Sequence, residues 1–595
     1  MLSGLKTLRN ASWKDAAVLI AVGFIVLFFI ATSFETAIHL GTFVVPLIAA
    51  VFLFVLIVWA GLVAAMPAKE ALRYARLCFV PSIIFLLLIP YNFFYLLPHG
   101  VRPVSALIIV IAGIFLFSVI LRQPKRDTSH FGISLPWLIA LMVAYALFFG
   151  AIAVLRHLNF QDASSFDVAL YNQIQWNNIH GRFYQSSISG SNFVTHNSPF
   201  LILISPFYAI YPHPGTLLII KTIFLTASAI PYYFLLRRFV SRHAIGPLLI
   251  GYLFYPYIIG QQFNAPHEVC FLPPFLLLAL YFFLTSRFYL FLGFLFLCLS
   301  VKEHMAMIAV MFGLYAFLLK RSRRWIVVPI VSGGAWAVFS FWIMHHFQQI
   351  YTVDPYPAWL IDNIKGRFLR PGYAMGENFI WGMRTSVMGN AHAAAFAYPI
   401  FAAVGLIFPF LSCISLLGLP ELAINFVANL PLFYPDWHYN IVVGCFFMVG
   451  CAHSIGRLPT RFHFGLPAVK MQQLCAWLIC LCVLSHSFLW LDYLQMKSQP
   501  VYLADMKEAI DLIPENASVS APKHLVSHVS TRDHYFLLQD ERKGDYILID
   551  QDKVIEDPIM SFGKIFHYER IFEKNGVSLY KKIMMSVGPS TSYGK

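Results

Sequence analysis

The chain has 595 residues, of which 59% are hydrophobic and 12% are charged, and its formal net charge is +14. About a quarter of the residues of soluble domains are charged, so this composition excludes an ordinary soluble domain and indicates a polytopic membrane protein. The positive charge does not indicate nucleic-acid binding, because the basic residues lie in short connectors rather than in one patch. All nine cysteines lie in or beside apolar segments, which suggests neither a disulfide framework nor a zinc signature.

Apolar segments that are long enough to cross a bilayer as helices recur along the chain, and about fifteen are expected because a span needs roughly 20 mostly apolar residues. The first follows three basic residues, as a signal peptide does, but its length and the lack of a small-residue cleavage site favour a retained span. The expected spans are Ala16–Thr32, Gly41–Met66, Leu77–Leu97, Val104–Leu121, Pro136–Leu155, Thr216–Leu236, Ala244–Ile259, Val269–Leu284, Phe288–Val301, Met305–Leu319, Trp325–Met344, Phe396–Leu411, Leu416–Leu430, Ile441–Ala452 and Met471–Trp490.

The distribution of Lys and Arg predicts the orientation of these spans, because basic residues in short loops mark the cytoplasmic side. With a cytoplasmic N-terminus, five cytoplasmic connectors carry basic clusters: Lys69, Arg73 and Arg76; Arg122, Lys125 and Arg126; Arg237, Arg238 and Arg242; Lys320, Arg321, Arg323 and Arg324; and Arg457, Arg461 and Lys470. The same count places the loop 156–214, the long loop 345–395 and the C-terminal tail outside the cytoplasm.

The first of these external loops contains an unusually polar segment, Ser164–Ser198, with one acid among aromatic residues, amides and histidines. Asp167 stands where a membrane enzyme would hold a catalytic carboxylate at the bilayer edge. In a helix, Gln173 and Trp176 fall on one face, and together with His196 they are candidate binding residues. An equally open interpretation is that Ser165 or Asp167 only caps the helix that begins there.

Ionisable residues also stand at the external ends of two neighbouring spans. His267 and Glu268 lie in NAPHEVC, and Lys302 and Glu303 lie in SVKEHM. Ionisable groups at membrane depth usually face a cavity or a partner, so all four are candidate binding residues. The alternative is an ion pair that only holds the helix ends together.

Four further residues have a candidate role in binding a phosphate or lining a pocket. Lys221, inside the sixth span, either extends its ammonium group to the lipid headgroups, which is the favoured interpretation, or meets a lipid phosphate. Arg370 and Arg384 belong to the long external loop and either clamp a phosphate or form an interfacial belt. His438 in YPDWHY forms a pocket wall or packs within its loop.

The chain changes character after Trp490. A helix near Ala504–Leu512 is followed by short strand-like runs, SVSA, YFLLQ, DYILID and VSLYKK, separated by turn residues. These features predict a small extracytoplasmic α/β domain at 496–583 and a flexible tail at 584–595. The chain before residue 496 is expected to divide into additional N-terminal membrane helices at 1–130 and a membrane module at 131–495.

Several common catalytic signatures are missing in a suitable context, namely GxxxxGK[ST], GxGxxG, HExxH and GxSxG. Their absence lowers the expectation of an ATPase, a nucleotide-dependent dehydrogenase, a zinc protease or a serine hydrolase. Energy for a reaction outside the cell must then arrive with the substrate, as it does in an activated lipid-linked donor.

Several motifs of the chain resemble those of one known family. They are FDVALYNQIQW followed by HG, THNSPFLILISPFYAIYPHPGTLLIIKT, HE, KEH, and LPELAINFVAN ahead of DWHY. The family is a large bacterial family of polytopic membrane proteins related to the GT-C glycosyltransferases. The resemblance covers the chain from about Pro136 to its end. It implies a mostly α-helical membrane fold with a C-terminal domain outside the membrane, in the bacterial inner membrane.

The resemblance also implies chemistry. An aspartate in the first external loop of the module acts as base, which here is Asp167, and a polyprenyl-phosphate sugar is the donor. The acceptor is a glycan, a lipid or a protein, the other partners are membrane lipids, and no nucleic acid is expected. The acidic doublet usual in such enzymes is absent, since Ser165 and Phe166 directly precede Asp167, so neither a metal nor a cofactor is expected.

The sequence therefore favours an inverting glycosyltransferase, in which Asp167 accepts a proton from the attacking hydroxyl. Lys302, Lys221, Arg370 or Arg384 would stabilise the charge on the departing lipid phosphate. Two alternatives remain: a flippase or transporter of a lipid-linked glycan, and a structural membrane subunit. Transporters usually have matching halves, and the chain shows no clear pair of them.

Overall fold

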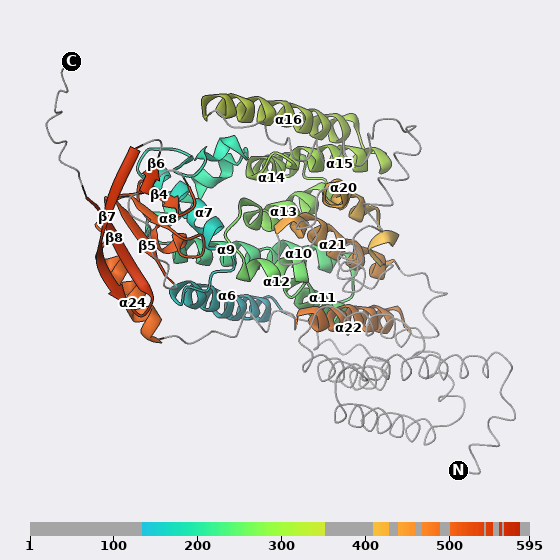
Figure 1. The fold of residues 1–595 in the computed structure, drawn as a ribbon. Coiled ribbons are helices and arrows are strands. Elements are labelled where there is room, and N and C mark those ends of the chain that lie inside the picture. Colours follow the sequence, from blue (N-terminus) through green and yellow to red (C-terminus); the bar gives the residue numbers. More distant parts are fainter. Residues whose placement is uncertain are drawn as a thin grey trace, which may run out of the picture.

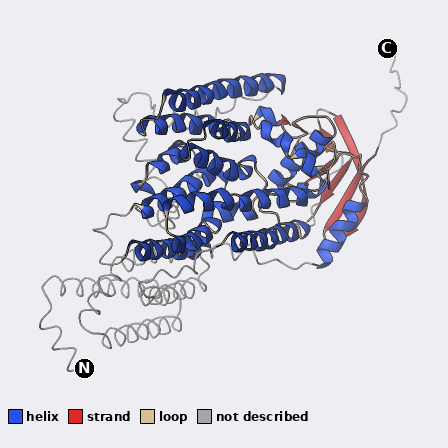
Figure 2. Ribbon diagram, turned by 180° about the vertical axis from the view of Figure 1, so that it is seen from behind, coloured by secondary structure: helices blue, strands red, loops and turns tan. Residues whose placement is uncertain are grey.

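The computed structural model describes residues 134–351, 408–427, 438–457, 467–487, 500–540, 543–550, 559–561 and 564–583. The four spans expected before Pro136, most of the span Phe396–Leu411, and the tail 584–595 lie outside these residues. In the described part, apolar helices lie side by side and a small sheet packs at one end of them (Figure 1). The reverse view shows the same separation of helices from strands (Figure 2). The protein is thus mostly α-helical with a small C-terminal sheet, as the sequence predicts.

The helices follow the expected apolar segments closely. Four in the described ranges are long and apolar enough to cross a membrane, or five if a bent pair counts as one span, so the larger number of spans stays a prediction. The helices of this region are α6 (Leu135–Leu158), α7 (Ser165–Ile179), α8 (Ser205–Tyr208), α9 (Pro214–Ala227), α10 (Ala229–Phe239), α11 (Arg242–Leu253), α12 (Pro256–Phe263), α13 (Pro273–Leu284), α14 (Phe288–Val301), α15 (Met305–Leu318), α16 (Arg323–Tyr351), α20 (Leu419–Val427), α21 (Ile441–Gly456) and α22 (Ala468–Ser487).

Proline residues explain where the helices break. The expected span Ala244–Ile259 is a pair of helices, α11 and α12, bent by 43°. Pro256 is the first residue of α12, and a proline disfavours helical geometry in the residue before it while it suits the first turn of a new helix. In the same way Pro273 begins α13, so the expected span Val269–Leu284 is helical only from that residue on, after a short 3-10 turn at Glu268–Phe271.

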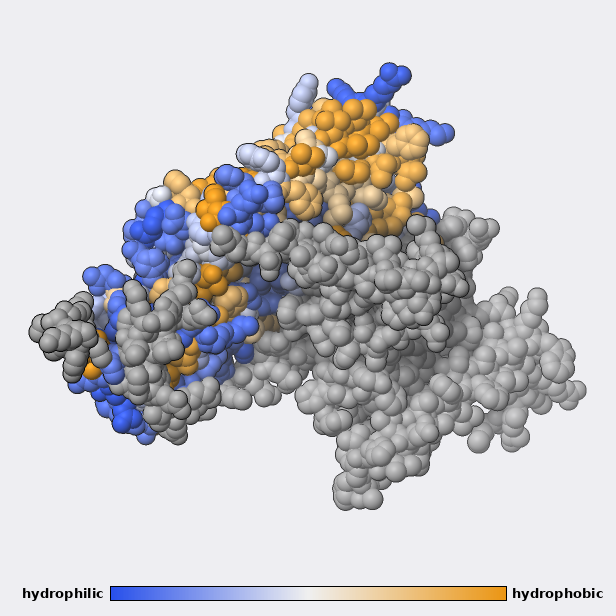
Figure 3. All heavy atoms as spheres, turned by 45° about the horizontal axis from the view of Figure 1, so that its top comes forward, coloured by the Kyte–Doolittle hydropathy of each residue, from blue (hydrophilic) through white to orange (hydrophobic). Residues whose placement is uncertain are grey.

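Apolar side chains gather on the outer face of the helical region. Figure 3 shows them over α15 and α16, while hydrophilic side chains cover the C-terminal domain. On α16, Val331, Val338 and Trp342 are all largely exposed. A helix with such a face is suited to lipid contact, because the hydrocarbon of the bilayer replaces a protein partner.

Polar site residues and basic residues lie at opposite ends of the helices. At one end the ring of His438, just before α21, stacks on His267. At the other end His453 of α21 lies against Phe239 at the end of α10, next to the connector that carries Arg242. Arg237, Arg238 and Arg242 therefore lie at the opposite end of these helices from His267, and the cytoplasmic placement of the basic connectors stays a prediction.

The C-terminal domain is a six-stranded mixed sheet with strand order β4-β3-β5-β8-β7-β6. β3 is parallel to β4 and β5, and the other pairs are antiparallel. The expected strand-like runs are present, and the expected helix is α24, but β6 and β7 were not expected: β6 has only three residues, and charged residues interrupt the hydrophobic residues of β7. The elements are α24 (Pro500–Asp511), β3 (Val519–Ala521), β4 (Tyr535–Leu537), β5 (Tyr546–Ile549), β6 (Ile559–Ser561), β7 (Lys564–Lys574) and β8 (Val577–Ile583); β1 (Gln185–Ser186) and β2 (Gly190–Ser191) form a separate hairpin in the polar segment.

The helix α7 joins the membrane module to this domain. Ala169 is buried in the apolar core of the C-terminal domain, and Phe166 packs against that core. The hydroxyl of Ser165 donates a hydrogen bond to Ser527 Oγ over 2.8 Å, and the Asn172 amide donates to Ser530 Oγ over 2.9 Å. Because these polar contacts are buried, the domain and α7 form one packed unit.

Candidate functional site

Asp167 lies in the first turn of α7, and its carboxylate is not used to cap that helix. The N-cap residue is Ser164, whose side chain makes no capping bond to the backbone. Instead the Ser164 hydroxyl donates a hydrogen bond to Oδ2 of Asp167. The Asp167 side chain remains 30% exposed, so a substrate hydroxyl can reach it. The geometry favours the interpretation of Asp167 as an available carboxylate over that of a helix cap.

One histidine faces this carboxylate, and a second histidine stacks on the first. Nε2 of His267 lies 3.8 Å from Oδ2 of Asp167. The rings of His267 and His438 are stacked with centroids 3.7 Å apart, and Tyr171 meets His267 edge-on. The sequence-predicted residues Asp167, His267 and His438 are therefore brought together from three distant segments of the chain.

Behind the histidines lies a buried ion pair. Nζ of Lys302 is 2.5 Å from Oε1 of Glu268, and the Glu268 side chain is fully buried. The Tyr171 hydroxyl donates a hydrogen bond to Oε2 of the same carboxylate. Burial alone would raise the pKa of Glu268, but the charge of Lys302 and the nearby histidines outweighs burial and holds this pKa well below its usual value. The ion pair that the sequence offered as the alternative is therefore present, and a part of Glu268 and Lys302 in substrate binding stays a prediction.

A second acid and histidine pair extends this polar region. Nδ1 of His196 lies 3.0 Å from Oε1 of Glu303, and the backbone amide of Asn197 donates to Oε2 of Glu303 over 3.1 Å. Beyond it, Nε2 of His304 is 3.9 Å from Oε1 of Glu421 on α20. Glu421 was not among the predicted site residues. An acid inside the apolar run LPELAINF was the available signal, because buried acids in membrane segments usually have a partner or a function.

Two of the predicted binding residues, Gln173 and Trp176, lie at the interface with the C-terminal domain. Gln173 is fully buried, and its amide group bonds the backbone carbonyls of Arg532 and Asp533 in the C-terminal domain. The indole of Trp176 donates to Oδ1 of Asp533 over 3.3 Å. Both side chains thus hold the domain interface, and a part in substrate binding stays a prediction. Arg370 and Arg384 lie outside the described residues.

Lys221 corrects the sequence interpretation. Its side chain was expected to extend to the headgroups, but it is fully buried, and its ammonium group donates to the carbonyls of Gln262 and Asn264 over 3.1 and 2.5 Å. The C-terminal end of α12 leaves these carbonyls without helical partners, and the lysine satisfies them. Lys221 therefore stabilises the segment that leads to His267 and does not meet a lipid phosphate in this arrangement.

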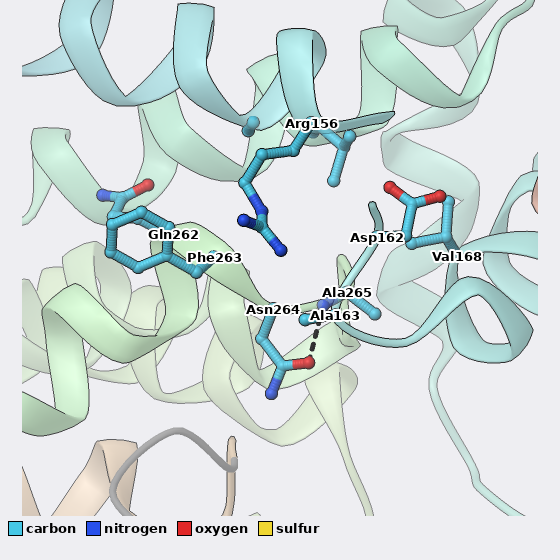
Figure 4. Close-up of a pocket in the computed structure, with 10 residues that line it drawn as sticks. Arg156, Asp162, Ala163, Val168, Gln262, Phe263, Asn264 and Ala265 are labelled. Atoms are coloured by element: carbon cyan, nitrogen blue, oxygen red, sulfur yellow. Dashed lines mark hydrogen bonds between the residues drawn. The ribbon is translucent and has the colours of Figure 1, made fainter. Parts of the chain in front are cut away.

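A small cavity lies beside the loop that precedes α7 (Figure 4). Its volume is about 10 Å³, and its lining includes Arg156, Asp162, Val168 and Asn264. A cavity of this size holds about one water molecule and no sugar. It is therefore not the substrate site in this arrangement.

The polar region predicts an acid-sensitive fold. Burial and the charge of Lys302 lower the pKa of His304 to about 4. Burial alone would raise the pKa of Glu303, but His196 and Lys302 outweigh it and lower this pKa. Since the folded state binds these protons less readily than the unfolded chain, its stability is full above about pH 6.5 and declines as the pH falls toward 4.

We therefore expect the melting temperature of the detergent-solubilised protein to fall between pH 7 and pH 4. The variant Glu303→Gln should have a shallower decline at the acidic end, because it lacks one of the carboxylates that must be protonated. A melting temperature that stays constant or rises over this range would show that these groups do not have the assigned charge states.

Comparison with known proteins places these residues in a family. A family model described as predicted membrane protein (DUF2079) matches residues 156–579, and a search of curated proteins found no match. Among solved structures, the chain is similar to ArnT from Cupriavidus metallidurans bound to undecaprenyl phosphate, with 10% identity, a TM-score of 0.43, and coverage of 75% of this chain and 98% of that one. The chain is also similar to apo ArnT from the same organism, with 10% identity, a TM-score of 0.44, and coverage of 74% of this chain and 97% of that one. With arabinofuranosyltransferase AftD from Mycobacteria the identity is 12% and the TM-score is 0.39, and the match covers 76% of this chain and 40% of that one.

Proposed function

The chain belongs to the DUF2079 family of predicted membrane proteins, and we propose that it is a membrane glycosyltransferase of the GT-C type. Its donor is a sugar linked to a polyprenyl phosphate, and its acceptor is a glycan, a lipid or a protein on the extracytoplasmic face of the bacterial inner membrane. The proposal includes the full set of about fifteen spans and a cytoplasmic N-terminus. It requires neither a metal nor a cofactor at Asp167.

One observation carries this proposal: a partly exposed carboxylate lies beside two stacked histidines at one end of a set of apolar helices. Among the described residues, Asp167 accepts one side-chain hydrogen bond, from Ser164, so its oxygens keep lone pairs for an incoming hydroxyl. A scaffold protein has no need of such an arrangement. A transferase needs it, because a general base must be within hydrogen-bond reach of its substrate.

The reaction step follows from this placement. Asp167 takes the proton of the acceptor hydroxyl while the hydroxyl oxygen forms a bond to the anomeric carbon of the donor. The bond between that carbon and the lipid phosphate oxygen breaks at the same time, and its electron pair leaves with the phosphate. Attack from the face opposite the phosphate inverts the anomeric configuration.

The departing phosphate needs donors near Asp167. His267 is suited to this role because it lies next to the carboxylate, and His438, from a different segment, stacks on it. Lys302 acts through its pair with Glu268, the residue that follows His267, and so fixes the position of the histidine. The proposal keeps Arg370 and Arg384 as further phosphate ligands from the long external loop.

The test is the release of lipid product. The purified protein is placed in liposomes that contain polyprenyl-phosphate-linked sugars, and the appearance of free polyprenyl phosphate is followed by mass spectrometry. A transferase releases polyprenyl phosphate only when an acceptor is present. A flippase moves the intact donor between leaflets and releases none, which would overturn the proposal.

A further inference from the structure

A second cluster of ionisable side chains lies where the C-terminal domain meets the membrane module. It consists of His157 at the end of α6, Asp162 in the following loop, and His528 in a short 3-10 turn of the C-terminal domain. One ligand atom from each residue lies within 4.8 Å of the other two. All three side chains are almost completely buried. None of them has a part in the chemistry proposed for Asp167.

The contacts within the cluster leave one nitrogen unused. Nδ1 of His157 lies 2.9 Å from Oδ2 of Asp162, and the Ser527 hydroxyl donates to the same oxygen over 2.7 Å. Nε2 of His528 faces this oxygen at 4.0 Å, which is too long for a hydrogen bond. Among the described residues this buried nitrogen has no hydrogen-bond partner. A buried polar atom without a partner is costly, and a missing ion is one common explanation.

We propose that His157, Asp162 and His528 bind a divalent transition metal ion, with zinc as the first expectation, that fastens the C-terminal domain to the membrane module. Two imidazole nitrogens and one carboxylate oxygen form an established zinc ligand set. In a tetrahedral site with bonds of about 2.0–2.2 Å, the ligand atoms lie roughly 3.3–3.5 Å apart. The widest spacing here, up to 4.8 Å, must therefore close by about 1.3–1.5 Å. Nδ1 of His157 and Oδ2 of Asp162, which are 2.9 Å apart, must move slightly apart.

The surroundings suit such a site. The Ser527 hydroxyl orients the carboxylate, as residues around metal ligands commonly do. The three ligands come from a membrane helix, from the loop five residues before Asp167, and from the C-terminal domain. The metal would thus hold the loop of Asp167 in place without touching the substrate, and this role stands whether or not the protein transfers sugars.

The experiment uses full-length protein in detergent, with any histidine tag removed because it would bind zinc. After treatment with a chelator and incubation with Zn²⁺, the protein is dialysed and its metal content is measured. We expect about one zinc ion per chain in the wild type, and loss of that ion in His528→Gln and Asp162→Asn. The matched control is His524→Gln, which removes a histidine of the same domain that pairs with Asp550 outside the cluster, and it should keep the ion.

Two further measurements distinguish the loss of a zinc site from misfolding of the ligand variants. Ser527→Ala keeps all three ligands and should weaken zinc affinity by about 10–100-fold. In the chelated wild type, Zn²⁺ should raise the melting temperature and protect the C-terminal domain from protease, whereas Mg²⁺ should do neither. Equal zinc content in the wild type and both ligand variants, or a melting temperature that Zn²⁺ leaves unchanged, would overturn the proposal.

Discussion

The variant Asp167→Asn is expected to lower the rate of sugar transfer by about 10²–10⁴-fold, which is the usual contribution of a general base. Asn has nearly the same shape but cannot accept the proton of the attacking hydroxyl. Because the side chain is partly exposed and makes one side-chain hydrogen bond, the change in stability should stay within about 0.5 kcal/mol. The measurement is the initial rate of polyprenyl phosphate release at equal amounts of folded protein.

A matched control distinguishes loss of the base from loss of charge near the membrane surface. Asp511→Asn removes an exposed carboxylate at the end of α24 in the C-terminal domain and should leave the rate unchanged. If Asp167→Asn and Asp511→Asn both turn over at the wild-type rate, Asp167 is not the base.

The second large effect is on stability. Glu268→Gln should lower the free energy of unfolding by about 3–5 kcal/mol, because it leaves the Lys302 ammonium group buried without its counter-charge. Lys302→Met should be about as harmful, since it leaves the Glu268 carboxylate buried. The double variant should recover part of the loss, because it removes both charges together. Chemical denaturation in detergent measures all three.

An exposed ion pair provides the control for this prediction. Nζ of Lys574 contacts Glu508 at 2.6 Å, and both side chains are about half exposed, at 49% and 51%. Glu508→Gln should cost between about 0 and 1 kcal/mol, because water screens the charges and replaces the lost contact. Equal effects of Glu268→Gln and Glu508→Gln would contradict the burial of the Glu268 pair.

The sequence predicts the helices well where a single physical signal decides them. The expected segment Phe288–Val301 is identical to α14, because a continuous apolar run has one stable form in a membrane. The same signal fails at Ala244–Ile259, where hydropathy does not register the helix break at Pro256. It also fails at β7, where charged residues and a register shift between Arg570 and Phe572 interrupt the apolar alternation, although the strand lies between two others.

The candidate site is predictable only in part, for a related reason. Asp167, His267 and Lys302 could be selected because ionisable residues at the ends of apolar segments are costly without a partner. Which of them touch is a property of the tertiary structure. Gln173 has the same polar character as its neighbours, yet it bonds the C-terminal domain. The contact between Asp162 and Ser527 joins residues 365 positions apart, and no local pattern in one sequence indicates such a pairing.

The position of the donor phosphate is the most direct test of the proposed site. A polyprenyl phosphate analogue with a photoreactive group next to the phosphate is bound to the full-length protein, and the labelled peptides are identified by mass spectrometry. The proposed site predicts labelling in residues 165–179 and 264–272, and competition by unlabelled polyprenyl phosphate. Labelling confined to the exposed apolar face of α16, with neither of those segments modified, would contradict a lipid-linked donor beside Asp167.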